Sequence, residues 1–172
     1  ELARAQARRA EEEAGRAEAA AVEAEEALNQ QLEVEAALRA SEARFRAMAD
    51  SSPLGIYITG PAGDCQYTNL AYQRISGLTQ QAALGTGWSQ AIHPEDRERV
   101  FGAWYDAAGR RQPFRSEHRF LQADGKVVWT RVNAAEILDE ERLIGYVGLV
   151  EDISEHAADQ TALRQSEERY RA

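Results

Sequence analysis

The sequence predicts an α+β protein with a five-stranded antiparallel sheet and short helices on one face, preceded by a long coiled-coil helix and followed by an exit helix. Three observations support this fold class. Residues 1–50 contain one Gly and no Pro and are rich in Ala, Glu and Arg, a composition that favours helix. Residues 51–153 alternate short β-branched and aromatic runs with turn residues. Residues 154–172 are again charged and contain neither Gly nor Pro, so we expect three segments with these boundaries.

The first helix carries a heptad pattern that we call the seam. Seven alanines are spaced alternately by four and three residues, and larger residues continue the same phase. The seam consists of Ala3, Ala7, Ala10, Ala14, Ala17, Ala21 and Ala24, followed by Leu28, Gln31, Glu35, Leu38, Glu42 and Phe45. Such a pattern is typical of a coiled coil, although a solvated single helix is the alternative. Ala buries little area per residue, so we expect a weak, closely packed interface.

The elements of the central segment follow from local signals. The helix should stop near Pro53, because a residue that precedes Pro avoids the α region. We expect strands at Leu54–Thr59, Asp64–Thr68, Phe114–Gln122, Lys126–Leu138 and Leu143–Val150. We expect helices at Asn69–Ser76, Thr79–Leu84 and His93 to about Ala108. Hairpin turns between successive strands favour an antiparallel sheet.

The strand that begins at Phe114 shows the clearest alternation. Phe114, Ser116, His118 and Phe120 share one face, and the charged residues between them share the other. We therefore expect the first set to face the interior.

The last predicted strand runs directly into the exit helix. Asp152 or Ser154 can cap this helix, because either side-chain oxygen can accept from a first-turn N–H. We expect Asp152, Ile153 and Ser154 to couple the sheet to the helix. The sequence Ala37–Ala47 recurs as Ala162–Ala172 with eight of eleven residues identical, which places Leu163 and Tyr170 in the seam phase of Leu38 and Phe45. The chain is therefore expected to be a fragment that leads into another similar module.

The composition excludes several classes of function. A net charge of −9 without a basic block argues against nucleic acid and against anionic membrane surfaces. A single cysteine, Cys65, excludes an internal disulfide and a Cys-rich zinc site. The sequence has no apolar run of about 20 residues and no basic, apolar leader, so a cytoplasmic location is expected.

Four motifs occur in a fixed order between about residues 41 and 155. They are Gly87-Trp-Ser-Gln-Ala-Ile-His-Pro-Glu-Asp-Arg97, Glu117-His-Arg-Phe with Asp124-Gly125 and Val128-Trp129, Gly145-Tyr-Val-Gly148, and Asp152-Ile-Ser154. Their order and spacing resemble a PAS domain with its PAC half. Ser-Glu-Xaa-Arg-Phe/Tyr-Arg resembles the helix that precedes such domains in sensor histidine kinases and diguanylate cyclases. The resemblance implies a sensory or dimerising domain that is not itself catalytic.

The resemblance also bears on cofactors, and neither haem nor a flavin adduct is favoured. The likeness is to the PAS subgroup whose helix starts with His-Pro-Glu/Asp-Asp-Arg, and His93 belongs to that ordinary helix start. Phe101 stands where haem-binding relatives would carry their ligand His. Cys65 lies outside the Asn-Cys-Arg-Phe-Leu-like helix that photosensory relatives require, so we interpret it as structural. His156 lacks the neighbours of a phosphoacceptor His. No metal site is predicted.

We interpret the protein as a cytoplasmic signalling module that forms a parallel homodimer through its helices and controls a covalently linked effector domain. The first alternative is a sensor that binds a small molecule under its sheet. The candidate lining residues are Ile56, Ile58, Tyr67, Tyr72, Trp88, His118 and Phe120. The second alternative is a passive dimerisation spacer with a filled core.

Overall fold

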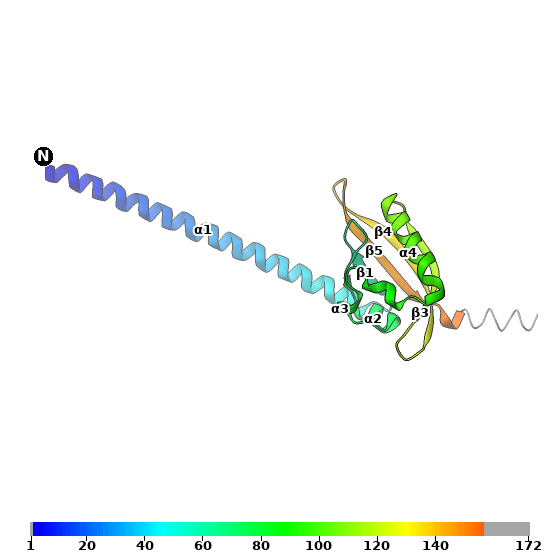
Figure 1. Ribbon diagram of the computed structural model, residues 1–172. Coiled ribbons are helices and arrows are strands. Elements are labelled where there is room, and N and C mark those ends of the chain that lie inside the picture. Colours follow the sequence, from blue (N-terminus) through cyan, green and yellow to red (C-terminus); the bar gives the residue numbers. More distant parts are fainter. Residues whose placement is uncertain (1, 157–172) are drawn as a thin grey trace, which may run out of the picture. The chain divides into compact units, whose positions relative to one another are not determined.

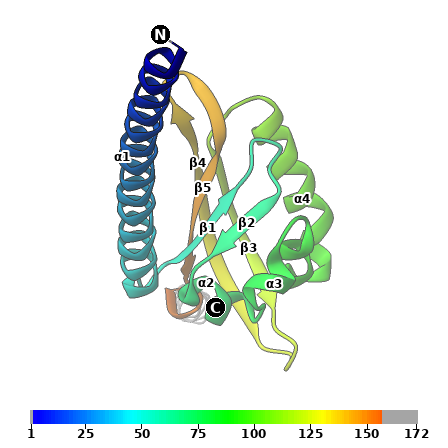
Figure 2. The same cartoon turned by 90° about the vertical axis from the view of Figure 1, so that its left-hand side faces the viewer.

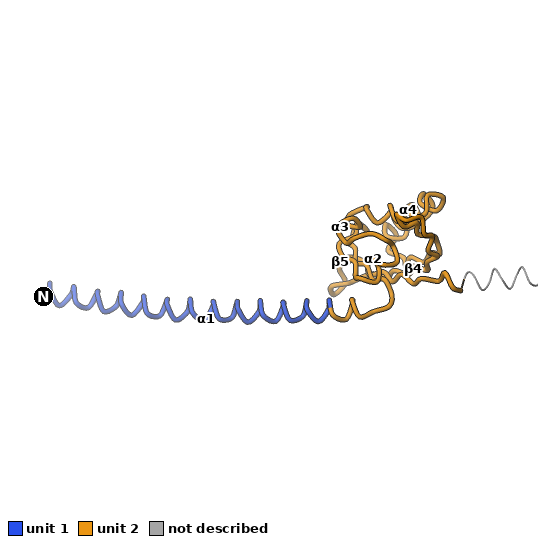
Figure 3. The backbone as a smooth tube through the Cα atoms, turned by 90° about the horizontal axis from the view of Figure 1, so that it is seen from below, with its two compact units in different colours: residues 1–46 blue, residues 47–172 orange. Residues whose placement is uncertain are grey.

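The computed structural model describes residues 2–156, which fall into two compact units. Figure 3 distinguishes residues 1–46 from residues 47–172. The first unit contains most of α1 (Leu2–Ser51), a helix of 50 residues. All residues from Leu2 to Met48 are exposed in the single chain, and Ala49 is buried. The long helix is confirmed, while its pairing with a second helix stays a prediction.

The second unit is built on a five-stranded antiparallel sheet, as the sequence predicted (Figure 1). The strands are β1 (Gly55–Thr59), β2 (Cys65–Thr68), β3 (Phe114–Leu121), β4 (Val127–Asp139) and β5 (Arg142–Asp152). Their order across the sheet is β2-β1-β5-β4-β3, so the first strand of the unit lies beside the last. This closure places the two ends of the unit on adjacent central strands.

The helices of the second unit lie on one face of the sheet (Figure 2). They are α2 (Leu70–Ser76), α3 (Gln80–Ala83), the 3-10 helix η1 (Gly87–Ala91) and α4 (Pro94–Gly109). Each α-helix begins with a side-chain cap, from Asn69, Thr79 and His93 respectively. The sequence predicted the three α-helices but not η1, which is too short to show a helical period.

The hydrophobic core fills the space between α4 and the sheet. Trp104 is almost fully buried, and its indole N–H donates a 3.0 Å hydrogen bond to the carbonyl of Gly63. The Tyr146 hydroxyl, from β5, donates a 2.7 Å bond to the carbonyl of Ala108. Because both bonds join α4 to elements distant in sequence, they fix the helix over the sheet and define the walls of the site.

Candidate functional site

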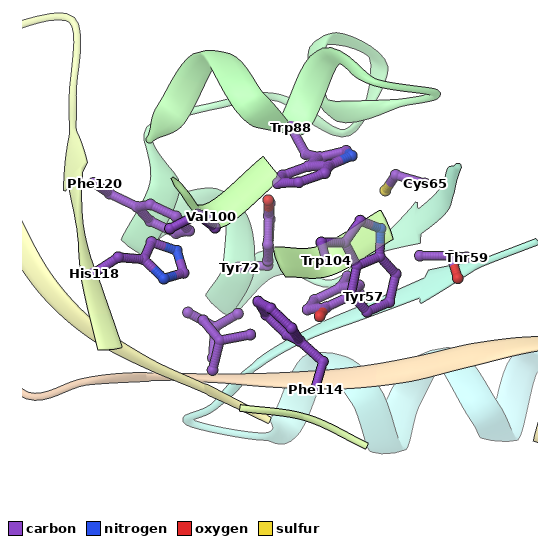
Figure 4. Close-up of a pocket in the computed structure, with 12 residues that line it drawn as sticks. Tyr57, Thr59, Cys65, Tyr72, Trp88, Val100, Trp104, Phe114, His118 and Phe120 are labelled. Carbon is purple, nitrogen blue, oxygen red and sulfur yellow. The ribbon is translucent and has the colours of Figure 1, made fainter. Parts of the chain in front are cut away.

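A small cavity lies between the sheet and its covering helices (Figure 4). Its volume is about 40 Å³. It is lined by Tyr57, Thr59, Cys65, Tyr72, Trp88, Val100, Trp104, Phe114, His118, Phe120, Val132 and Val150. One water molecule needs at least about 10–15 Å³ by this kind of measure, and pockets for drug-sized ligands enclose about 300–1,000 Å³. In this conformation the cavity therefore has room for a few water-sized groups.

Four of the seven residues predicted to line a ligand pocket surround this cavity: Tyr72, Trp88, His118 and Phe120. The structure does not bring Ile56, Ile58 or Tyr67 to it. On β1 the inward residues are Tyr57 and Thr59, so Ile56 and Ile58 point to the opposite face of the sheet. Tyr67 is the cross-strand partner of Ile58 and therefore shares its face.

The inward register of β1 depends on two glycines. A Cβ atom at Gly55 would lie 3.0 Å from the Cα of Tyr72 and 3.1 Å from the Cβ of Val150. Gly148 is the cross-strand partner of Tyr57, and a Cβ atom there would overlap the phenol ring. These glycines leave room for α2 and for the Tyr57 ring.

Sequence reasoning missed eight lining residues, among them Val100 and Trp104 on α4. Their spacing of four residues places them on one helical face, a signal that could have identified them. Phe114 lies on the same strand face as His118 and was predicted to be inward, but it was not named as a pocket residue. Tyr57 and Thr59 gave no such signal, because both faces of β1 carry large residues.

His118 is the one imidazole on the cavity wall. Its side chain is buried, and its Nδ1 atom lies 3.0 Å from the Ser116 hydroxyl. Burial lowers its pKa to about 4, and the charge of Arg99 acts in the same direction. The ring is therefore neutral at pH 7 and offers one hydrogen-bond donor and one acceptor.

The other ionisable groups of the wall are also uncharged at neutral pH. Burial raises the pKa of the Cys65 thiol to about 11, so the thiolate that would act as a nucleophile is scarce. Burial likewise raises the pKa values of Tyr57 and Tyr72 above the ordinary value for tyrosine. The wall thus presents neutral, weakly polar groups within an apolar surface.

His93 caps α4, as expected from the sequence: its Nδ1 atom accepts a 3.3 Å hydrogen bond from the N–H of Glu95. Phe101 stacks against Trp88, with ring centroids 5.8 Å apart. Within residues 2–156, no group of three or more His, Cys, Asp or Glu side chains is placed to hold a metal ion.

The exit junction, residues Asp152, Ile153 and Ser154, is tied to β4 through the backbone of Trp129. The N–H of Ile153 donates a 2.8 Å bond to the Trp129 carbonyl. The Trp129 N–H in turn donates a 3.0 Å bond to the Ser154 hydroxyl oxygen. Asp152 accepts a 2.9 Å bond from the N–H of Ser154, the first of the helical residues 154–156. Sheet hydrogen bonding therefore continues up to the first residue of this helix. The rest of the predicted exit helix, residues 157–172, lies outside the described residues.

A second junction, which the sequence did not reveal, holds the end of α1. The Asn69 side-chain amide donates to the carbonyls of Ala49 at 2.6 Å and Leu54 at 3.0 Å. Its oxygen accepts from the N–H groups of Ile56 at 2.7 Å and Tyr72 at 2.9 Å. One buried amide thus joins α1, β1 and α2.

The seam residues have two different outcomes. Those on α1 lie on a continuous helix, and all of them are exposed in the single chain: Ala10, Ala14, Ala17, Ala21, Ala24, Leu28, Leu38 and Phe45. Leu163 and Tyr170 lie outside the described residues.

Among the helices of residues 2–156, none has the length and hydropathy needed to span a bilayer.

Comparison with known proteins identifies the family. Residues 66–150 match the sequence profile of the PAS fold. The protein y4lL of Sinorhizobium fredii, described as uncharacterized, is 38% identical over 120 residues, which is 69% of this chain and 14% of y4lL. The sensor histidine kinase TmoS of Ectopseudomonas mendocina is 27% identical over 135 residues, 75% of this chain and 14% of TmoS. The chain therefore spans about a seventh of the length of these curated relatives.

Solved structures agree on the fold. The crystal structure of the PAS domain of a protein from Colwellia psychrerythraea superposes with a TM-score of 0.55 at 23% identity, covering 66% of this chain and 98% of that one. The sheet order, the helices on one face and the matched residues all fall within the second unit. The second unit of this chain is a PAS sensor domain.

Proposed function

We propose that this chain is a signalling module that relays a conformational change through its flanking helices to an output domain outside these 172 residues, either a histidine kinase or a diguanylate cyclase. The observation that carries the proposal is the exit junction. No loop separates β5 from the exit helix, and Ile153 and Ser154 are both hydrogen-bonded to Trp129. A displacement of β4 would therefore reach the helix without being absorbed by flexible chain.

We place this relay in a parallel homodimer on the cytoplasmic side of the cell, and the exposed apolar residues of the α1 seam support its helical interface. Leu28, Leu38 and Phe45 are 55%, 59% and 43% exposed in the single chain. A second helix packed along the seam would cover this apolar surface. The polar seam residues Gln31 and Glu35 weaken such an interface, which suits a helix pair that must change packing.

The energies needed are modest. Shifting a two-state population from 1:99 to 99:1 takes roughly 5.5 kcal/mol of differential stabilisation. Because Ala buries little area and the polar residues weaken the seam further, alternative packings of the helix pair can differ by only a few kcal/mol. The domain itself is not assigned a catalytic role, and the output domain supplies the chemistry.

The phase of the helix provides the test. In the full-length protein, deletion of residues 15–21 removes seven residues and keeps the heptad phase, whereas deletion of residues 15–18 removes four. Four residues rotate the remaining helix by about 40° relative to whole turns, at 3.6 residues per turn. We expect regulated output from the first variant and output locked on or off in the second. Regulated output from both would contradict the relay.

A second candidate function, a small-molecule sensor, is favoured by the cavity. His118 and the hydroxyls of Tyr57 and Tyr72 give its apolar wall several neutral hydrogen-bonding groups. The volume of about 40 Å³ means that a larger ligand would require α4 or η1 to move outward. Haem is not favoured, since the Phe101 side chain cannot ligate iron. A covalent flavin adduct is not favoured, since Cys65 lies on β2 and not on a helix.

Absorbance and native mass spectrometry of gently purified protein would distinguish the candidates. A stoichiometric small molecule that is lost on His118→Leu would support the sensor. A mass equal to that of the polypeptide alone, together with loss of regulation in the four-residue deletion, would support relay without a bound ligand. Unregulated output in every variant would favour the passive spacer.

A further inference from the structure

Arg119 anchors the first turn of α4 to β3. Its carbonyl accepts a 2.8 Å bond from the N–H of His93, and its own N–H donates a 3.0 Å bond to Asp96. Its guanidinium donates to both carboxylate oxygens of Asp96, at 2.9 and 3.0 Å, and to Glu95 at 2.9 Å. These bonds hold the pKa of Asp96 well below its usual range. Main chain and side chain therefore connect the strand to the helix start at one residue.

The same guanidinium also lies over the indole of Trp129. Arg119 and Trp129 are cross-strand partners on β3 and β4, and the guanidinium carbon is 5.6 Å from the ring centroid. A planar cation over an indole face is attracted by the ring quadrupole. The contact lies on the outer face of the sheet, opposite the cavity, because Arg119 alternates with the inward residues His118 and Phe120.

Trp129 is the residue whose backbone holds the exit junction. Its carbonyl accepts from Ile153 and its N–H donates to Ser154. Any rotation of Trp129 about the strand axis would change both bonds together. A continuous set of contacts thus leads from the α4 N-terminus through Arg119 and Trp129 to the exit helix.

The cavity adjoins this route at its start. His118 and Phe120 flank Arg119 in the sequence, and both line the cavity. Val100, one turn beyond the α4 segment that Arg119 binds, lines it as well. A change in cavity contents or packing that moves α4 would therefore pull on the Arg119 ion pairs.

We propose that Arg119 is a positioning residue that couples the start of α4 to the exit junction by holding Trp129. The proposal rests on the relay function above and names the side-chain contact through which the relay reaches Ile153 and Ser154. The coupling between the two residues is measurable as a non-additive effect of their substitutions.

The test is amide hydrogen exchange in the full 172-residue chain. Arg119→Gln should accelerate exchange of the Ile153 N–H at least tenfold, while the buried Val132 amide in the centre of β4 keeps its rate. Arg111→Gln is the matched control, because Arg111 also joins the α4 region to the sheet by an ion pair, at 2.9 Å to Glu136, but lies at the other end of the helix. It should leave the Ile153 rate unchanged.

Two further variants distinguish positioning from a general structural role. Arg119→Lys keeps a positive charge near Asp96 but has no planar group to lie over the indole. This variant should have the exchange rates of the unsubstituted chain near the start of α4, while the Ile153 amide should still exchange fast. Trp129→Leu should accelerate Ile153 alone, and adding Arg119→Gln should add little further, since both changes remove the same contact.

An Ile153 rate that matches the Arg111→Gln control, or additive effects of the two substitutions, would overturn the proposal. These outcomes are independent of the deletion experiment on output. Intact phase dependence with an unchanged Ile153 rate would mean that the relay uses another contact. A fast Ile153 amide without phase dependence would support the coupling through Arg119 and reject the relay.

Discussion

The side-chain amide of Asn69 donates a 2.6 Å hydrogen bond to the carbonyl of Ala49, and this bond attaches the last turns of α1 to the PAS domain. Asp50 strengthens the attachment by accepting a 3.0 Å bond from the N–H of Leu70. Both helical connections of the domain therefore use side-chain hydrogen bonds to backbone groups. At the α1 end the single side chain of Asn69 bonds backbone groups of the helix and of β1. At the exit end two side chains share this role, since Ser154 accepts from the Trp129 N–H and Asp152 accepts from the Ser154 N–H.

Asn69→Ala should strongly destabilise the domain. The substitution removes four hydrogen bonds at once. The N–H groups of Ile56 and Tyr72 lose their bond to the Asn69 oxygen, whereas the carbonyls of Ala49 and Leu54 keep a bond from Ser52. We expect a loss of about 2–4 kcal/mol in the free energy of unfolding, measured by urea denaturation, because unsatisfied buried polar groups are costly. Asn133→Ala, on the exposed face of β4, is the control and should change stability by less than about 0.5 kcal/mol. Equal effects would show that Asn69 has no special role.

Gly148→Ala should destabilise the domain, whereas Gly102→Ala should not. A Cβ atom at Gly148 would overlap the Tyr57 ring and force it toward the cavity, at a cost of about 1–3 kcal/mol. Gly102 lies within α4 with open space around its Cβ position, so Ala should add about 0.5–1 kcal/mol through helix propensity. Thermal unfolding of both variants is the measurement. A stable Gly148→Ala variant would mean that Tyr57 can leave its position at little cost.

His118 should make stability depend on pH. Its pKa in the folded state is lowered to about 4 from 6.5, so the unfolded chain binds more protons between these values. The contribution of the neutral imidazole to the free energy of unfolding is fully present above about pH 6.5. It is lost as the pH falls toward 4, by roughly 3 kcal/mol in total. His118→Leu should flatten this part of the stability profile, measured by urea denaturation at several pH values. An unchanged slope would show that the ring is not protected from protonation.

The seam should control association. Deleting residues 1–40 should weaken the dimer markedly in sedimentation equilibrium. A sharper comparison uses two substitutions of equal charge: Ala17→Glu, in the seam, and Ala19→Glu, two residues further and on the outer side of a heptad helix. The first should weaken association because it places charges in the interface, and the second should have little effect. Undiminished dimerisation of the truncated chain would mean that the helices are not the main interface.

Much of the fold was predictable from sequence because the signals are local. A long Ala-rich run without Gly or Pro determines a helix, Pro53 stops it, and alternation in β3 assigns Phe114, His118 and Phe120 to the interior. Turn residues between strands of the right length then predict the β1–β2 hairpin and the antiparallel meander of β3, β4 and β5, whereas the pairing of β1 with β5 is non-local. The strand bounds differ from the predicted ones by at most two residues.

Only the tertiary structure decided the inward face of β1. Ile56 and Ile58 are more apolar than Tyr57 and Thr59, so alternation alone favours the wrong face. The close packing of Gly55 against Tyr72 and of Tyr57 against Gly148 sets the observed one. Most hydrogen-bond partners of Asn69 and Arg119 lie 13 to 24 residues away, beyond the reach of any local periodicity. Hydrophobic burial constrains element type through short-range pattern, but hydrogen-bond networks and cavity walls depend on which distant side chains the completed fold brings together.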